Sequence, residues 1–581
     1  MVMGYLQQCV SNKGRLRKVK KCPNVGSVTQ RKGLHMLDGR KSFYAIVGVV
    51  TAFFFTTSAA AHTMIVVPEL DATKSNIVFQ ILDHNEQHSS IIRSTTNEGK
   101  ERICKSFSDP RCSSLEEYKV EIILPPCSAK STNLDYCIRG LDITGNDGKM
   151  IATSLVREVQ TPRIAANLSA KIGTGGGISI WKIAPGKSSD PASNVATEIS
   201  LTYLVTKNLK TKNLNPAQLA DIKIAVYPVQ FRTGAFEPLD YLINNEGSDV
   251  LGVNPASQKI DDSSQCHWTE KGVCALQGHF HADTNVAISV QMDNKLRGWL
   301  SSQILDLKIQ EKKISPITNL LEISGRASKS SPVYAIDNIS DISKMNELRA
   351  AYNRCGNDVL VCPQAYEQYD NIIWEGILTD NTKDSQFNFG LADVISASLT
   401  DIEGVDSQWK LSSMPQAHWR KGVSWSPCVS NSKVLAGVVS TNASLYQMNP
   451  PELVDQKLVS RVEGAHHNSK HELNKVDYQV AMRGDVLRCL LKKNTNPTSV
   501  KATAFSSAGE VMENPAVQMV EQNGWVNFAA KNFSYSTPNV EFVFSTPVVK
   551  TVSKTISCAK GKKIVKVKAA APKCPKGYKK V

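Results

Sequence analysis

The sequence predicts a mainly β protein, with several antiparallel β-sandwich domains, a small helical insert and a disulfide-closed C-terminal hairpin. Two observations support this prediction. Short β-branched and aromatic runs are separated by Gly, Pro, Asn and Asp, and the cysteines fall in near-neighbour pairs along the chain. A chain of 581 residues is also long enough for several domains with cores of their own.

Shifts in composition along the chain suggest how it is organised. We expect a leader over 1–61, a β domain over 62–175, a β-sandwich domain over 176–339, a helical insert over 340–405, a β domain over 406–550 and a basic disulfide hairpin over 551–581.

The leader has the pattern of a secretory signal peptide. Arg40 and Lys41 precede an apolar run over Phe43–Thr57, and small residues follow up to Ala61, where we expect cleavage. An uncleaved membrane anchor is the alternative. Met36 is a second possible start, which would leave residues 1–35 untranslated. No later stretch is apolar enough to cross a membrane, so we expect a secreted or cell-surface protein without a transmembrane span after cleavage.

Strands are expected wherever β-branched and aromatic residues alternate with polar ones. Such runs cover 118–126, 199–206, 221–231, 285–293, 302–310 and 540–549. The clearest hairpin spans 137–156, where Gly145–Gly148 supplies the turn. Helical patterns are confined to the insert. There, Ser340 and Gly356 have the character of the start and stop of a helix, and 363–373 and 391–402 are further candidates.

The twelve cysteines after the leader predict six local disulfides, which is typical of an exported protein. Pairing by proximity gives Cys104–Cys112, Cys127–Cys137, Cys266–Cys274, Cys355–Cys362, Cys428–Cys489 and Cys558–Cys574. The C-x-x-C spacing of a zinc site is absent from the sequence. The connectivity itself cannot be proved from spacing.

The net charge of +15 belongs to the two ends of the chain. The leader contributes +9 and residues 545–581 contribute +11, which leaves −5 for the body over 62–544. The body is therefore mildly acidic, and we expect no nucleic-acid partner. An anionic cell-envelope polymer is the expected partner of the basic tail, and a carbohydrate is another possible ligand.

The tail is expected to be a folded module. Residues 556–559 and 563–568 have the pattern of two strands around Lys560 and Gly561, so several lysines would share one face. A Cys558–Cys574 bridge would stabilise so small a module by about 3 kcal/mol. The expected envelope contacts are Lys560, Lys562, Lys563, Lys566, Lys568, Lys576, Lys579 and Lys580.

Common catalytic motifs are missing from the sequence. It has no G-x-S-x-G elbow, and the S-x-x-K match at Ser430–Lys433 lacks its partner motifs. His471 and Glu472 resemble the start of a zinc-protease helix, but Lys475 stands where the second histidine is needed. Gly173–Gly177 lacks the Gly-Lys-Ser/Thr of a phosphate loop and is interpreted as a surface loop. We expect no cofactor, and the catalytic residues of any hydrolase remain unknown.

Two histidine pairs are weak metal candidates. His279 and His281 would share a face if they lay on a strand, and His467 and His471 would lie one turn apart on a helix. Half-exposed strand-edge histidines and a solvated loop are the simpler interpretations. Trp409, Trp419 and Trp425 would stack on sugar rings if they were exposed, but they are better explained as core residues.

One segment resembles a known family. Cys266, Trp268, Cys274 and Phe280, followed by the Gly-Trp-Leu of residues 298–300, are similar to a segment of a secreted, β-rich actinobacterial family of uncharacterised activity. The resemblance covers about 70 residues. It implies a secreted β-rich fold and no activity.

The C-terminus is similar to a Lys-rich terminal motif of exported actinobacterial proteins. The matching residues are Cys558, Lys560, Gly561, Lys562, Pro572, Cys574, Pro575, Gly577, Tyr578 and Lys579. This resemblance implies export and retention at the cell envelope.

These observations together favour an exported, envelope-associated structural or ligand-binding protein over an enzyme. A secreted hydrolase acting on polysaccharide or peptide is the alternative. A binder of the periplasmic type is disfavoured, because alternating βα units are nearly absent.

Overall fold

The computed structural model describes residues 77–82, 90–183, 194–236, 266–336, 364–377, 400–413, 426–505, 511–545 and 554–581, with gaps of one to five residues within these ranges. The leader, the pair Cys355–Cys362, Trp419 and Trp425 lie outside the described residues. So do the helix predicted over 340–356 and most of the one predicted over 391–402.

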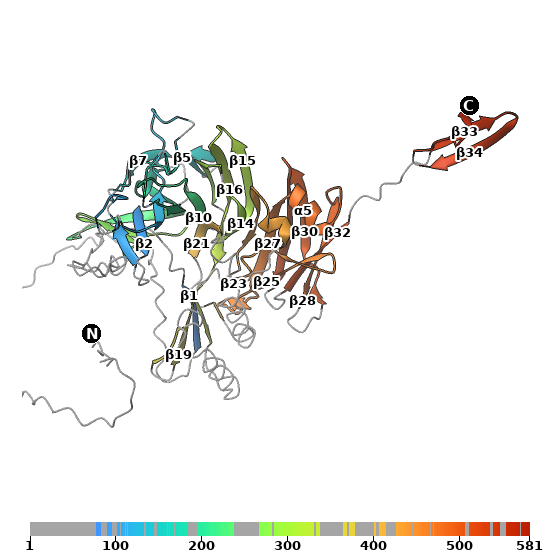
Figure 1. The fold of residues 1–581 in the computed structure, drawn as a ribbon. Coiled ribbons are helices and arrows are strands. Elements are labelled where there is room, and N and C mark those ends of the chain that lie inside the picture. Colours follow the sequence, from blue (N-terminus) through green and yellow to red (C-terminus); the bar gives the residue numbers. More distant parts are fainter. Residues whose placement is uncertain are drawn as a thin grey trace, which may run out of the picture. The chain divides into compact units, whose positions relative to one another are not determined.

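The described chain is mainly β, as predicted, and its strands form several largely antiparallel sheets (Figure 1). The largest, which we call the long sheet, has the strand order β3-β2-β4-β9-β10-β21-β14-β22-β27-β31-β30. Its strands are β2 (Ile91–Thr95), β3 (Glu101–Cys104), β4 (Glu117–Ile123), β9 (Asn194–Thr206), β10 (Gln218–Thr233), β14 (Gly298–Ser302), β21 (Asp406–Ser413), β22 (Leu435–Thr441), β27 (Lys475–Arg483), β30 (Ala516–Gln522) and β31 (Trp525–Ser534).

A second sheet packs on the first half of the long sheet and makes a sandwich with it. Its strand order is β15-β16-β13-β5-β6, from β5 (Cys137–Thr144), β6 (Met150–Ala152), β13 (Asn285–Asp293), β15 (Ile304–Lys313) and β16 (Thr318–Ser330). The hairpin predicted over 137–156 is confirmed by the pairing of β5 with β6. The core between the two sheets contains side chains such as Ile122, Tyr203 and Ile288. Residues on both sides of the boundary expected at 175/176 therefore share one core.

Two long strands, β9 and β10, also form part of a smaller layer. One edge of β9 pairs with β10 along its length, while the other pairs first with β8 and then with β4. Trp268 and Tyr227 are buried together in a small core on this side. The added strands are β7 (Ser154–Glu158), β8 (Ser179–Lys182), β11 (Trp268–Glu270) and β12 (Val273–Gln277).

The second half of the long sheet forms a second sandwich. Its partner sheet consists of β23 (Leu445–Tyr446), β24 (Glu452–Val454), β25 (Lys457–Glu463), β28 (Ser499–Phe505), β29 (Val511–Glu513) and β32 (Asn539–Ser545). Tyr478, Phe528 and Phe542 are fully buried between the two sheets. The helix α5 (Gly484–Leu491) adds Leu487 and Leu490 to the same core, and Cys428–Cys489 links it to the short helix α4 (Pro427–Ser430).

The strand β14 contributes to both sandwiches. Because neighbouring side chains on a strand point to opposite faces, Trp299 enters the second core while Leu300 enters the first. The Trp299 indole leaves no room above β22, since a Cβ at Gly437 would lie 2.2 Å from its Cζ3 atom. The Gly-Trp-Leu segment is thus the strand at which the two cores meet.

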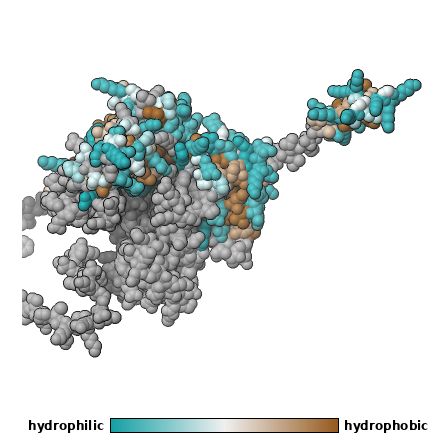
Figure 2. Space-filling view, viewed as in Figure 1, coloured by the Kyte–Doolittle hydropathy of each residue, from teal (hydrophilic) through white to brown (hydrophobic). Residues whose placement is uncertain are grey.

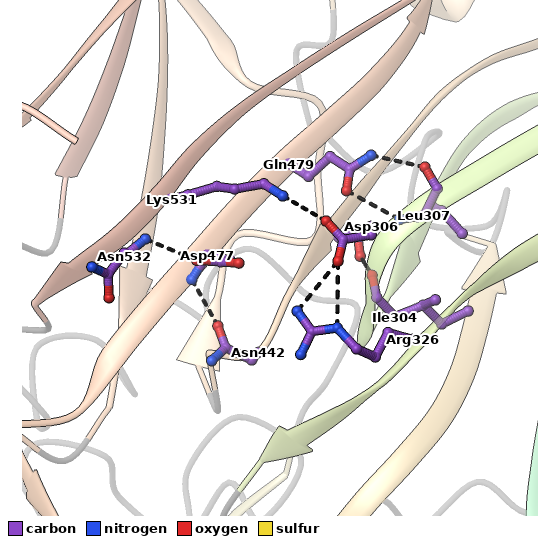
Figure 3. A network of polar contacts seen from close by, with 10 residues as sticks. Ile304, Asp306, Leu307, Arg326, Asn442, Asp477, Gln479, Lys531 and Asn532 are labelled. Atoms are coloured by element: carbon purple, nitrogen blue, oxygen red, sulfur yellow. Dashed lines mark hydrogen bonds and ion pairs between the residues drawn. The ribbon is translucent and has the colours of Figure 1, made fainter. Parts of the chain in front are cut away.

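A polar network ties β15 to β27 and β31 at the same junction (Figure 3). The Gln479 side chain accepts a hydrogen bond from the Leu307 N–H and donates one to the Leu307 carbonyl. Asp306 accepts hydrogen bonds from Lys531 Nζ at 2.5 Å and from Arg326 Nη2 at 3.3 Å. The amide of Gln479 therefore takes the place of a strand neighbour for a residue of β15, which lies at the edge of its own sheet.

A separate sheet has the order β18-β19-β1-β17-β20-β26. Its strands are β1 (Ile77–Leu82), β17 (Val333–Ile336), β18 (Gln364–Gln368), β19 (Asn371–Ile377), β20 (Thr400–Asp401) and β26 (His467–Asn468). The helix predicted over 363–373 is wrong, because β18 and β19 form an antiparallel hairpin there. Tyr366, Ile372, Ile373 and Trp374 favour strands, and pairing of β19 with β1 across the sequence overrides the local helical pattern.

Five of the six predicted disulfides are present in the described chain. They are Cys104–Cys112, Cys127–Cys137, Cys266–Cys274, Cys428–Cys489 and Cys558–Cys574. Among the described residues, no helix is both long and apolar enough to cross a membrane.

Candidate anion-binding sites

The C-terminal module, residues 554–581, is a small sheet of its own. It contains β33 (Lys554–Lys560), β34 (Lys563–Ala569) and β35 (Lys579–Lys580), in the order β34-β33-β35. Gly561 has a φ of 59° in the turn, a left-handed conformation that glycine adopts without strain. The two strands predicted around Lys560 and Gly561 are confirmed.

The register of this sheet decides where its lysines lie. Residues directly opposite each other share a face. Lys566, Lys568 and Lys579 pair with residues 557, 555 and 559 of β33, so these three exposed lysines lie together on what we call the open face. The other face holds Cys558, which is fully buried and bonded to Cys574.

The module is positively charged all round. Residues 554–581 contain ten lysines and no Asp or Glu, and Figure 2 shows a mostly hydrophilic surface there. Lys560 and Lys563 even form a cross-strand pair. Like charges directly opposite each other destabilise a sheet, and a bound anion would relieve that repulsion. Such an arrangement suits a polyanionic ligand.

A cavity of about 550 Å³ lies beside the Cys127–Cys137 disulfide. We call it the disulfide cavity. Its two lining carboxylates have structural partners: Asp135 accepts from the Thr132 N–H, and Glu158 accepts from Arg163 and from the Gly177 N–H. Burial, followed by the neighbouring Asp293, raises the pKa of Tyr136 in its wall well above the ordinary value. Tyr136 therefore stays neutral at physiological pH.

The segment over Gly173–Gly177 is not a surface loop, because Gly173 and Thr174 line this cavity and Gly175, Gly176 and Gly177 are buried. A Cβ at Gly173 would lie 2.7 Å from the Tyr136 ring, and one at Gly176 would lie 2.4 Å from Glu158 Oε1. The glycines allow the backbone to pass close to both side chains. Their role is close packing, which fits the absence of a phosphate-loop motif.

A second cavity of about 730 Å³ adjoins the first, and Arg163 and Ala166 line both. We call it the lysine cavity. Three loops form it, over 106–108, 163–169 and 207–214, together with Ile92. The Cys104–Cys112 disulfide closes the first loop, and the second leads into the glycine segment. The third loop contributes Lys207 and Lys212 to the lining of the cavity.

The predicted histidine sites do not assemble in the described chain. His279 and His281 lie in the loop between β12 and β13 and not on a strand. His467 lies on β26 and His471 in the following turn with a φ of 61°, so the helical spacing that would join them does not exist. Across the described residues, no group of three or more His, Cys, Asp or Glu side chains is placed to hold a metal ion.

Trp409 is fully buried in the first core, and its Nε1–H donates to the Gly325 carbonyl at 3.1 Å. It is not available to stack on a sugar ring. Ser430 and Lys433 of the S-x-x-K match lie at the end of α4 and just before β22.

Sequence reasoning located the basic C-terminal module but missed the lysine cavity. The cavity is assembled from three loops far apart in sequence, and its lining takes one basic residue from the second loop, two from the third and none from the first. The only sequence signal was the glycine cluster at 173–177, which marks close packing and not charge.

Comparison of the chain with models of protein families, with curated proteins and with solved structures returned no match.

Proposed function

We propose that this protein is exported and retained at the cell envelope, where it acts as a ligand-binding or structural protein whose C-terminal module binds an anionic polymer. The observation that carries the proposal is the disulfide-closed sheet with ten lysines and no acidic residue. Supporting it, the body over 62–544 has the opposite net charge, so the module carries the net positive charge that attracts a polyanion.

Export is supported by independent features. Five disulfides are expected in an oxidising compartment outside the cytoplasm, where local bridges form and persist. The leader pattern and the two sequence resemblances point the same way. Cell fractionation tests this part, because a chain recovered with reduced cysteines in the cytoplasm would contradict it.

The polymer contact is expected to be electrostatic. Each lysine close to an anionic surface contributes about 1 kcal/mol, so removal of the three open-face charges should weaken binding by about 100-fold. Screening should weaken it further as salt rises, since the Debye length falls from about 10 Å at 0.1 M to about 3 Å at 1 M. The open face is thus the part of the module to change first.

The test compares full-length variants on immobilised poly(glycerol phosphate) and polyglutamate. In one variant Lys566, Lys568 and Lys579 are replaced by Gln. In the matched control, Lys308, Lys312 and Lys313, which lie on the exposed part of β15, are replaced by Gln. We expect only the first variant to lose retention at low salt. Equal retention of both variants would refute the role of the open face.

A further inference from the structure

The lysine cavity is a second place where positive charge gathers, and it is built very differently from the C-terminal module. Its described lining includes Arg163, Lys207 and Lys212 and contains no Asp or Glu. The volume of about 730 Å³ is within the range of small-molecule sites. Charge of one sign in a concave site concentrates oppositely charged ligands.

Lys207 is unusual for a lysine because it is only 8% exposed. Its Nζ donates to the Phe107 carbonyl at 3.1 Å and lies 5.9 Å from the centre of the Tyr118 ring. Lysine is rarely buried, because removing an ammonium from water is costly. The carbonyl and the aromatic face stabilise the charge, and they hold it in the wall of the cavity.

Two features of the cavity wall act on the charge of Lys207. Burial, and then the neighbouring charge of Lys212, lower the pKa of Lys207 below its ordinary value. An anion between the two ammonium groups would oppose both effects and favour the charged form. A bound anion would thus stabilise the arrangement that the loops impose.

Arg163 adds a third positive charge at the border of the two cavities. Its Nη2 is 2.8 Å from Glu158 Oε2, so this guanidinium is partly neutralised. Its side chain is nevertheless 60% exposed, which leaves guanidinium N–H groups for a ligand. Lys212 is exposed in the wall of the lysine cavity and adds positive charge that does not depend on Arg163.

Neutral polar groups complete the lining. Asn167 Oδ1 accepts from Ser169 Oγ at 2.8 Å and from the Ala170 N–H at 2.9 Å, which fixes the amide and leaves its N–H donors for a ligand. Ser106, Ser108 and Asn213 supply further hydroxyl and amide groups. Such groups match the hydroxyls of a sugar, whereas the cations match a phosphate or carboxylate.

We propose that the lysine cavity binds an anionic saccharide, a sugar carrying a phosphate or a carboxylate group. The anion would lie against Lys207 and Lys212, and the sugar hydroxyls would contact the loop of Asn167 and Ser169. This site goes beyond the proposed polymer contact, because it uses other residues and selects a monomeric unit.

The test is calorimetric titration of the full chain carrying the three open-face Gln substitutions, which weaken binding by the C-terminal module. The probes are glucose 6-phosphate, glucuronate, glucose and inorganic phosphate. We expect saturable binding of at least one of the two sugar anions, and the stronger of them identifies the charged group. Glucose and inorganic phosphate should bind at least tenfold more weakly. Failure of both sugar anions to bind, or equal binding of glucose, would overturn the proposal.

Variants assign the site. Lys212→Gln, at an exposed position in the cavity wall, should weaken the preferred sugar anion by about tenfold. Lys210→Gln is the matched control, because Lys210 is exposed in the same loop and is not part of the lining. An unchanged affinity in Lys212→Gln, or an equal loss in both variants, would contradict binding in this cavity. Since both positions are exposed, both variants should fold.

Discussion

Asp306 forms ion pairs with both sandwiches. It accepts from Lys531 of the second sandwich and from Arg326 of the first, and its own backbone has a φ of 52°. Partial burial acts to raise its pKa, but the hydrogen bond and charge of Lys531, with those of Arg326, outweigh burial and lower the pKa below the ordinary value. The folded protein therefore favours the ionised carboxylate more than the unfolded chain does.

The sign of this shift gives a pH-dependent contribution to stability. It is fully present above the unfolded pKa of about 3.9 and is lost as pH falls through the lower folded pKa. Asp306→Asn removes the charge and keeps a residue that tolerates positive φ. We expect a cost of at most about 1 kcal/mol at pH 7, since the group is partly exposed, and a smaller difference at pH 3.

Urea unfolding of the wild type and the Asn variant at both pH values measures this difference. If the two proteins differ in their free energy of unfolding by the same amount at pH 7 and pH 3, the charge of Asp306 is not the cause.

At the scale of elements, β14 and β22 show how closely the junction is packed. They pair in parallel, and Gly437 of β22 lies against the Trp299 ring. A methyl group at position 437 would also lie 2.8 Å from the Ala481 carbonyl oxygen. Gly437→Ala should therefore lower the free energy of unfolding by about 1–3 kcal/mol through overpacking.

The matched control is Gly140→Ala. Gly140 also lies within a strand, but a Cβ there would have nothing within 4 Å. We expect this substitution to change stability by less than about 1 kcal/mol, in the stabilising direction if the backbone tolerates it. Thermal and urea unfolding compare the two variants, and similar losses in both would argue against contact with Trp299 as the cause.

At the scale of the whole molecule, the second sandwich and the C-terminal module each have a disulfide of their own, so the stability of each part can be tested separately. Cys428–Cys489 closes 61 residues in the second sandwich, and Cys558–Cys574 closes 16 in the module. In the chain-entropy model, loss of the first costs about 4 kcal/mol and loss of the second about 3 kcal/mol.

We expect replacement of Cys428 and Cys489 by Ser to lower the midpoint temperature of the main unfolding transition. Tryptophan fluorescence measures this transition. Replacement of Cys558 and Cys574 by Ser should leave that transition unchanged and weaken retention on the polyanion. The module contains no tryptophan, so its unfolding is silent in this measurement. A lowered main transition in the second variant would mean that the module stabilises the sandwiches.

Local patterns in the sequence predicted much of this fold. The hairpin at 137–156, the strands around Gly561 and four of the five described disulfides depend on interactions within about twenty residues, whereas Cys428–Cys489 spans 61. The failure at 363–373 has the opposite cause, because β19 is held by β1 almost three hundred residues earlier. Nothing local could indicate that Gln479 would serve Leu307 as a strand neighbour, or that loops at 106, 163 and 207 would join to form one cavity.

The place of β14 in the long sheet also bears on how the chain folds. Leu300 pairs with Ser413 on one side and with Val438 on the other, more than one hundred residues further along the chain. Both cores thus require strands that are synthesised much later than β14. Such non-local pairing is intrinsically slow. The first 300 residues cannot complete either core on their own. For the export proposed above, that delay would be an advantage.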